Sequence, residues 1–118
     1  MILGSVTADG VPTIVLSIGG SDWIGVVDTG FNGDLELPLA LKDAVNARFL
    51  CRIRSLLAAG QIIEEDNYLV DLIFDELLVT AEATFTDSSE LLIGTGLVRS
   101  YRLVIDFPKQ TLRLEKAT

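Results

Sequence analysis

The sequence predicts an all-β fold, a small, mainly antiparallel and partly closed β-barrel with one or two short helices. Two observations predict it. Valine, isoleucine and threonine together supply 29 residues against nine alanines, a composition typical of strands. The apolar runs are short and are repeatedly broken by glycine, aspartate, asparagine or serine, as in strands joined by turns. A chain of 118 residues has room for one core, so we expect a single domain over residues 1–118.

Ten strands are predicted, at residues 2–7, 12–18, 23–27, 34–37, 47–57, 61–74, 77–86, 91–93, 101–107 and 111–115. Turn-forming residues join several of them, at positions 8–10, 19–22 and 108–110. A helix is expected at residues 39–46, because Pro38 suits a helix start and Leu41 and Val45 fall on one helical face. One further helical turn is expected at residues 96–100.

The composition excludes several classes of function. The chain has no histidine and only one cysteine, Cys51, which excludes Ser-His-Asp and Cys-His mechanisms and leaves no cysteine or histidine cluster for a zinc site. Seventeen acidic against nine basic residues give a net charge of −8, which argues against a nucleic-acid partner. We therefore expect no metal and no other cofactor, and any catalysis must use carboxylates, hydroxyls, lysines or backbone groups.

The distribution of apolar residues bears on where the protein works. No stretch approaches the ~18 uninterrupted apolar residues that cross a membrane, and the first ten residues lack the pattern of a secretory signal. A single cysteine forms no internal disulfide, so folding needs no oxidising compartment. We expect a cytoplasmic protein that does not contact a membrane.

One segment points to chemistry. Residues 23–27 form an apolar strand that runs directly into Asp28-Thr29-Gly30. Ionising an aspartate at the end of a buried strand is costly unless neighbouring groups hold its charge. Thr29 and Gly30 allow a tight turn whose hydroxyl and backbone N–H groups supply that support. The residues leave two interpretations open, an aspartate that caps its own loop and a catalytic carboxylate.

A faint internal echo accompanies this segment. Residues 26–30 and residues 92–96 both read apolar, apolar, any residue, threonine, glycine. In a β-rich chain a match of this length arises either by chance or from a genuine pseudo-repeat, and the sequence alone leaves both explanations open.

Taken together, Asp28-Thr29-Gly30 after an apolar strand, the later Leu92-Ile93-Gly94 and the all-β composition resemble the retroviral-type, or retropepsin-like, aspartic proteases. More narrowly, Phe31 directly after the first motif, with Gly33 and residues 35–38 following, looks like the prokaryotic clan AA group whose motif reads Asp-Thr-Gly-Phe. The resemblance extends from residue 12 to residue 115. It implies a barrel of the acid protease type and an aspartic endopeptidase that hydrolyses peptide bonds in a peptide or protein substrate.

The resemblance also implies a homodimer, in which each subunit contributes Asp28 to one dyad. Two carboxylates held close together share a proton, so one acts as general base on a water while the other polarises the scissile carbonyl. Thr29 then braces the loop across the dimer axis, and Gly30 brings the backbone close to the substrate. The terminal strands, at residues 1–7 and 111–118, are expected to contribute to the interface.

Substrate contacts follow from the same resemblance. They are assigned to Phe31, Asn32, Leu92, Ile93 and Gly94 near the dyad, and to Ala58, Ala59, Gly60 and Gln61 at the tip of a flap. The predicted flap is the hairpin at residues 52–63, where small residues and a glycine suit a mobile lid. An ordinary hairpin turn has the same sequence pattern, and Phe31 either narrows the cleft or belongs to the core.

The chain departs from the retroviral pattern at three positions. Retroviral enzymes carry alanine or serine after Asp-Thr-Gly, then an acidic residue that pairs with an arginine after the second motif. Here these positions are Phe31, Asn32 and Thr95, so both members of the ion pair are missing together. This indicates a rebuilt contact, and it supports a second hypothesis, a non-catalytic dimer of the same fold that binds a peptide or a protein.

Overall fold

The computed structural model describes residues 1–117 and consists almost entirely of strands. They are β1 (Ile2–Val6), β2 (Pro12–Ile18), β3 (Ser21–Val27), β4 (Leu35–Pro38), β5 (Arg48–Leu56), β6 (Ile62–Phe74), β7 (Leu77–Thr86), β8 (Leu91–Ile93), β9 (Tyr101–Asp106) and β10 (Thr111–Lys116). All ten predicted strands are present, with ends that differ from the prediction by no more than two residues.

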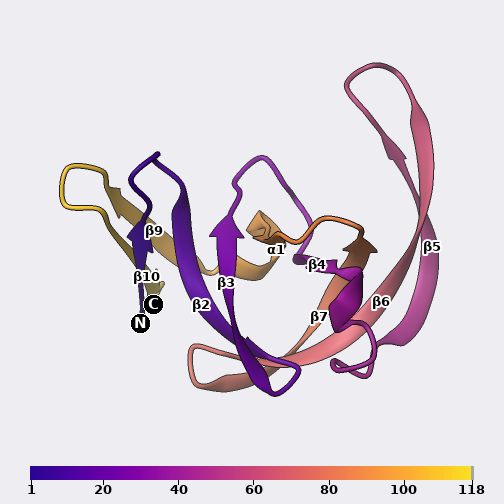
Figure 1. Cartoon of the computed structure of the whole chain (residues 1–118), viewed down its shortest axis with the longest axis horizontal. Coiled ribbons are helices and arrows are strands. Elements are labelled where there is room, and N and C mark those ends of the chain that lie inside the picture. The colour runs from indigo at the N-terminus through magenta and orange to yellow at the C-terminus, as the bar shows by residue number, and fades with distance from the viewer. Residues whose placement is uncertain (118) are drawn as a thin grey trace.

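The strands form one sheet in the order β5-β6-β7-β4-β8-β3-β2-β1-β10-β9. Ser17 of β2 also pairs with Ile73 of β6, which closes β6, β7, β4, β8, β3 and β2 into a ring. Only the β3–β8 and β4–β7 pairs are parallel. The predicted fold class, a mainly antiparallel and partly closed barrel, is therefore confirmed (Figure 1).

The core is built mainly from the strands of this ring, together with Leu112 and Leu114 of β10, and it follows from the alternation of side chains along each strand. In β2 the side chains of Ile14, Leu16 and Ile18 are buried while Val15 and Ser17 face outward. Each fully buried aliphatic side chain contributes roughly 1.5–3 kcal/mol to stability. The core includes Val27 and Ile93, the last residues of β3 and β8, and so fixes the strand ends from which the candidate site extends.

The helix predicted at residues 39–46 is wrong in extent. Only η1 (Leu39–Leu41), one turn of 3-10 helix, forms there, and the chain then passes through turns to Asn46, whose φ of 50° is left-handed. The segment buries Leu41 and Val45 and must then lead directly into β5, which begins at Arg48. A regular helix over all eight residues does not meet both requirements. The second helix, α1 (Thr95–Val98), begins one residue before the predicted turn.

Two hairpins project from the body of the molecule in Figure 1, the β5–β6 hairpin on one side and the β9–β10 hairpin on the opposite side. Strand β1 lies between β2 and β10, so the first and last strands pair with each other within one chain. Among the helices of residues 1–117, none has the length and apolar character needed to cross a membrane.

Candidate active site

The two segments that share a sequence pattern, residues 26–30 and 92–96, lie side by side and in register. In the parallel β3–β8 pair, Val26 is opposite Leu92 and Val27 is opposite Ile93. The amide of Asp28 then donates a hydrogen bond of 2.9 Å to the carbonyl oxygen of Ile93. Asp28 and Gly94 therefore leave their strands at the same level, and the shared sequence pattern corresponds to a shared position in the sheet.

The loop after Asp28 is attached to the start of α1 by three successive backbone amides. The amide of Gly94 donates to the carbonyl oxygen of Asp34 at 2.9 Å, that of Thr95 to Phe31 at 2.8 Å, and that of Gly96 to Gly33 at 3.0 Å. Because each of these bonds joins segments far apart in sequence, the tertiary structure fixes the loop in addition to the bond within its own turn, from the Phe31 amide to the carbonyl oxygen of Asp28 at 3.1 Å.

The Phe31 ring packs against the two glycines at this junction. A Cβ atom at Gly94 would overlap the carbonyl oxygen of Gly33 and lie 2.7 Å from both the ring and the carbonyl oxygen of Phe31. A Cβ atom at Gly33 would lie 2.8 Å from the ring. The half-buried ring thus occupies the space that side chains at both positions would need.

The Asp28 carboxylate is half-buried, and Thr29 and Gly30 are exposed. Its Oδ1 atom accepts a hydrogen bond of 2.9 Å from the amide of Gly30, so this aspartate does cap its own loop. No lysine or arginine within residues 1–117 forms an ion pair with it. One carboxylate oxygen supports the turn, and the other has no hydrogen-bond donor among the described side chains.

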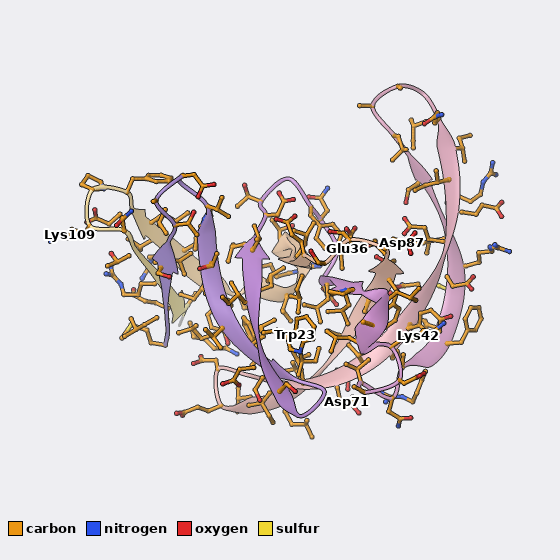
Figure 2. The ribbon with its side chains drawn as sticks, viewed as in Figure 1. Trp23, Glu36, Lys42, Asp71, Asp87 and Lys109 are labelled. Atoms are coloured by element: carbon orange, nitrogen blue, oxygen red, sulfur yellow. The ribbon has the colours of Figure 1, made fainter. Side chains whose placement is uncertain are left out.

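One further carboxylate, Glu36, lies close enough to Asp28 for the two charges to interact. Burial raises the pKa of Glu36 on β4, and the negative charges of Glu65 and Asp28 raise it further. Glu36 alternates with the buried Leu35 and Leu37, and Figure 2 shows it between the loop after β3 and the β5–β6 hairpin. The surroundings of Asp28 are therefore acidic.

A pocket of about 280 Å³ adjoins the loop. Its walls are Phe31, Asn32, Gly33, Asp34, Leu35, Ile53, Asn67, Glu82, Thr84 and Arg99. The buried Asn67 side chain donates a bond of 2.7 Å to Glu82 Oε1, and the amide of Glu82 donates at 2.9 Å to Asp34 Oδ2. This chain of bonds joins the Asp28 loop to β7 and to the base of the β5–β6 hairpin.

The structure divides the residues that the sequence assigned to substrate contact. Phe31 and Asn32 line the pocket. Leu92 is half-buried, whereas the Ile93 side chain is fully buried and Gly94 lies beneath the Phe31 ring, so these two support the loop. The tip residues Ala58, Ala59, Gly60 and Gln61 are all exposed at the far end of the hairpin.

Sequence reasoning missed Asp34, Glu36, Asn67 and Glu82. The alternation of Leu35, Glu36 and Leu37 does indicate that Glu36 faces away from the core, but no local pattern relates Asn67 or Glu82 to residue 34. These residues meet only because β4, β6 and β7 are neighbours in the sheet. Within residues 1–117, no group of three acidic or cysteine side chains is arranged to hold a metal ion.

Comparison with solved structures finds the same architecture in aspartic proteases. The chain is similar to a retropepsin-like aspartic protease from Rickettsia conorii, with a TM-score of 0.72 and 18% identity over 96% of this chain and 88% of that chain. It is also similar to the foamy viral protease-reverse transcriptase, with a TM-score of 0.59 and 17% identity over 83% of this chain and 13% of that chain. A third similar structure is the EIAV protease complexed with an inhibitor, with a TM-score of 0.58 and 14% identity over 80% of this chain and 91% of that chain.

No protein-family model and no curated protein matches the sequence. The likeness at these identities is one of structure. It extends over most of the chain. The chain therefore has the retropepsin-like aspartic protease fold.

Proposed function

We propose that this protein is an aspartic endopeptidase that works as a homodimer, with Asp28 of each subunit forming one catalytic dyad. The observation that carries the proposal is the position of Asp28, at the end of β3 and level with Gly94, half-buried and without a cationic partner in residues 1–117. The sequence holds a single Asp-Thr-Gly, so a two-carboxylate site needs two chains.

The proposed chemistry follows from placing two such carboxylates together. Two carboxyl groups about 3 Å apart do not both ionise, so the pair holds one proton and titrates as a unit. The ionised carboxylate removes a proton from water, whose oxygen attacks the carbonyl carbon of the peptide bond. The protonated carboxyl donates a hydrogen bond to the carbonyl oxygen. The C–N bond then breaks and the nitrogen takes up a proton, which leaves a free carboxyl and a free amine.

We assign the β5–β6 hairpin the role of the flap. Its tip is a tight turn in which the amide of Leu57 donates to the carbonyl of Gln61 at 2.8 Å and Gly60 has a φ of 81°. Ile53 and Glu65 are opposite each other in its two strands, and Ile53 also lines the pocket that adjoins the loop after Asp28. An extended peptide held between this hairpin and the Asp28 loop would bind by strand-like hydrogen bonds, with side chains in alternate pockets.

The test compares the wild type with Asp28→Asn on an unfolded protein substrate between pH 3 and pH 7. Cleavage by the wild type and loss of cleavage by the variant are expected, because asparagine does not accept the proton from water. Asp43→Asn is the matched control, since Asp43 is an exposed aspartate outside the site and its replacement should leave cleavage unchanged. Equal cleavage by wild type and Asp28→Asn would contradict the assignment.

A second candidate is a dimer that binds a peptide without cleaving it. The bond from the Gly30 amide to Asp28 Oδ1 favours it, because a loop-capping aspartate needs no catalytic role. Absence of cleavage together with saturable binding of an unfolded protein by both wild type and Asp28→Asn would support this function.

A further inference from the structure

Strand β9 leaves one edge of the sheet open. It is the last strand in the sheet order and pairs with β10 on one side, and within residues 1–117 no strand pairs with its other side. The terminal strands β1 and β10 are paired with each other within the chain. Of the two ends of the sheet, the other is β5, which belongs to the projecting hairpin.

The backbone groups at the open edge can be identified from the pairing. The amide of Ala117 donates to the carbonyl oxygen of Ser100, the residue before β9, at 2.9 Å. Because the bonded residues alternate along an antiparallel strand, the even-numbered residues of β9 bond to β10. The amide of Val6 donates to Gln110, which confirms that the even-numbered residues of β10 are turned toward β1 instead. In an antiparallel ladder the intervening residues point the opposite way, so the N–H and C=O groups of Leu103 and Ile105 face the open edge.

The side chains of β9 are also incompletely covered. Leu103 and Ile105 pack against the core but remain only partly buried. Beyond the end of the strand, 57% of Phe107 is exposed. An open edge with apolar side chains is a place where another strand adds, and monomeric proteins normally protect such edges.

The sequence of β9 is complementary to itself. Arg102 and Asp106 lie symmetrically about Val104, all three on the face of the strand turned away from Leu103 and Ile105. We propose that a second copy of the chain adds antiparallel to β9 with the two-fold axis at Val104. Leu103 then forms a hydrogen-bonded pair with the partner's Ile105, and Arg102 faces the partner's Asp106.

The charges of Arg102 and Asp106 favour the register centred on Val104 over the two adjacent registers. Centring the pair on Leu103 places Arg102 opposite Val104 of the partner subunit, and centring it on Ile105 places Arg102 opposite Pro108 of the partner subunit. Both leave Arg102 and Asp106 without an opposite charge across the edge, whereas the Val104 register forms two such pairs. Directly opposed residues in a non-hydrogen-bonded pair have the closest side chains, so these contacts discriminate most strongly.

The existing contacts of both residues are compatible with this arrangement. Arg102 Nη1 is 3.4 Å from Glu115 Oε2, and 68% of the Arg102 side chain is exposed. Asp106 Oδ1 accepts the amide of Lys109 at 3.0 Å, which leaves Oδ2 for the partner. Figure 2 shows Lys109 at the tip of the β9–β10 hairpin, far from the β5–β6 hairpin, so the interface does not occupy the proposed flap. This inference rests on the proposed function, which requires a second copy of the chain.

The test is a charge exchange followed by sedimentation over a range of concentrations. Arg102→Asp and Asp106→Arg should each weaken self-association at least tenfold, because like charges then face each other twice across the axis. The double variant should restore it to within about threefold of wild type. Arg113→Asp, on the same face but one strand from the edge, should have little effect. A double variant as weak as either single variant would overturn the inference.

Amide exchange gives an independent readout that does not depend on the stability of the variants. In the wild type, protection of the Leu103 and Ile105 amides should rise with protein concentration, while the Arg102 and Val104 amides stay protected throughout. Concentration-independent exchange at residues 103 and 105 would overturn the proposed edge. Asp28→Asn should associate like the wild type, so loss of cleavage in that variant and loss of association in the β9 variants separate the two proposals.

Discussion

The amide of Asp28 donates a 2.9 Å hydrogen bond to the carbonyl oxygen of Ile93, and this bond places the proposed catalytic residue beside Gly94. The bond depends on the parallel β3–β8 pair, since no residue near Asp28 in sequence contributes to it. The position of Asp28 is therefore sensitive to changes at the β8–α1 junction, where Gly94 is enclosed by Phe31 and Gly33.

Gly94→Ala should destabilise the protein by ~2–3 kcal/mol and abolish cleavage, because the added methyl group overlaps backbone atoms that cannot rotate away. Urea unfolding and the cleavage assay measure the two effects. Thr95→Ala is the matched control, because its amide still bonds to Phe31 and no neighbouring group is displaced. Wild-type stability in Gly94→Ala would contradict the packing described for Phe31.

Asp34→Ala should cost about 1–2 kcal/mol, because it removes the carboxylate that accepts the Glu82 amide. Asp34→Asn retains an acceptor oxygen and should lose less. The free energies of unfolding in urea distinguish the two variants. If both lose the same amount, the bond between the Asp28 loop and β7 does not contribute as the geometry indicates.

Mixing wild type with Asp28→Asn tests the shared dyad directly. If each site needs Asp28 from both chains, mixed dimers are inactive and the activity falls with the square of the wild-type fraction. If each chain instead carries a complete site of its own, activity falls in proportion to that fraction. The measurement is the initial cleavage rate after the mixture has equilibrated, at a constant total concentration.

Glu36→Gln should be more stable than the wild type near neutral pH. Burial and the charges of Glu65 and Asp28 raise the pKa of Glu36 above its ordinary value of 4.5, so the folded protein holds this proton more tightly than the unfolded chain does. Stability is consequently lost as pH rises through the raised pKa, and the variant avoids this loss.

The difference between the Glu36→Gln variant and the wild type should vanish below the ordinary pKa, where both forms are neutral. Unfolding at pH 3.5 and pH 7 measures it. Glu90→Gln, which removes one carboxylate at an exposed position, is the control.

Gly60→Val should reduce cleavage severalfold and lower the free energy of unfolding by no more than about 1–2 kcal/mol. The φ of 81° at Gly60 costs a β-branched residue about 1–2 kcal/mol, and this strain falls on an exposed tip that does not contribute to the core. Gly10→Val is the control, because Gly10 also has a positive φ, of 88°, but lies in an exposed turn outside the hairpin. Unaltered cleavage in Gly60→Val would argue against a role for the hairpin as a flap.

Local pattern predicted most of the fold. Short apolar runs and turn residues located all ten strands, because alternation and turn chemistry act over a few residues. The same reasoning failed at residues 39–46. There Leu41 and Val45 are buried as the helical spacing predicts, but the need to return to β5 outweighs the helical preference and leaves one 3-10 turn.

The sequence by itself determined which residues form strands, and it marked Asp28-Thr29-Gly30 and its echo at residues 92–96 as the segment of interest. Only the tertiary structure decided that the two segments lie in register, that Phe31 rests on Gly33 and Gly94, and that Asp34, Asn67 and Glu82 join one bonded chain. The physical reason is that strand propensity is local, whereas pairing between β3 and β8, or between β4 and β7, depends on closing the sheet around one core.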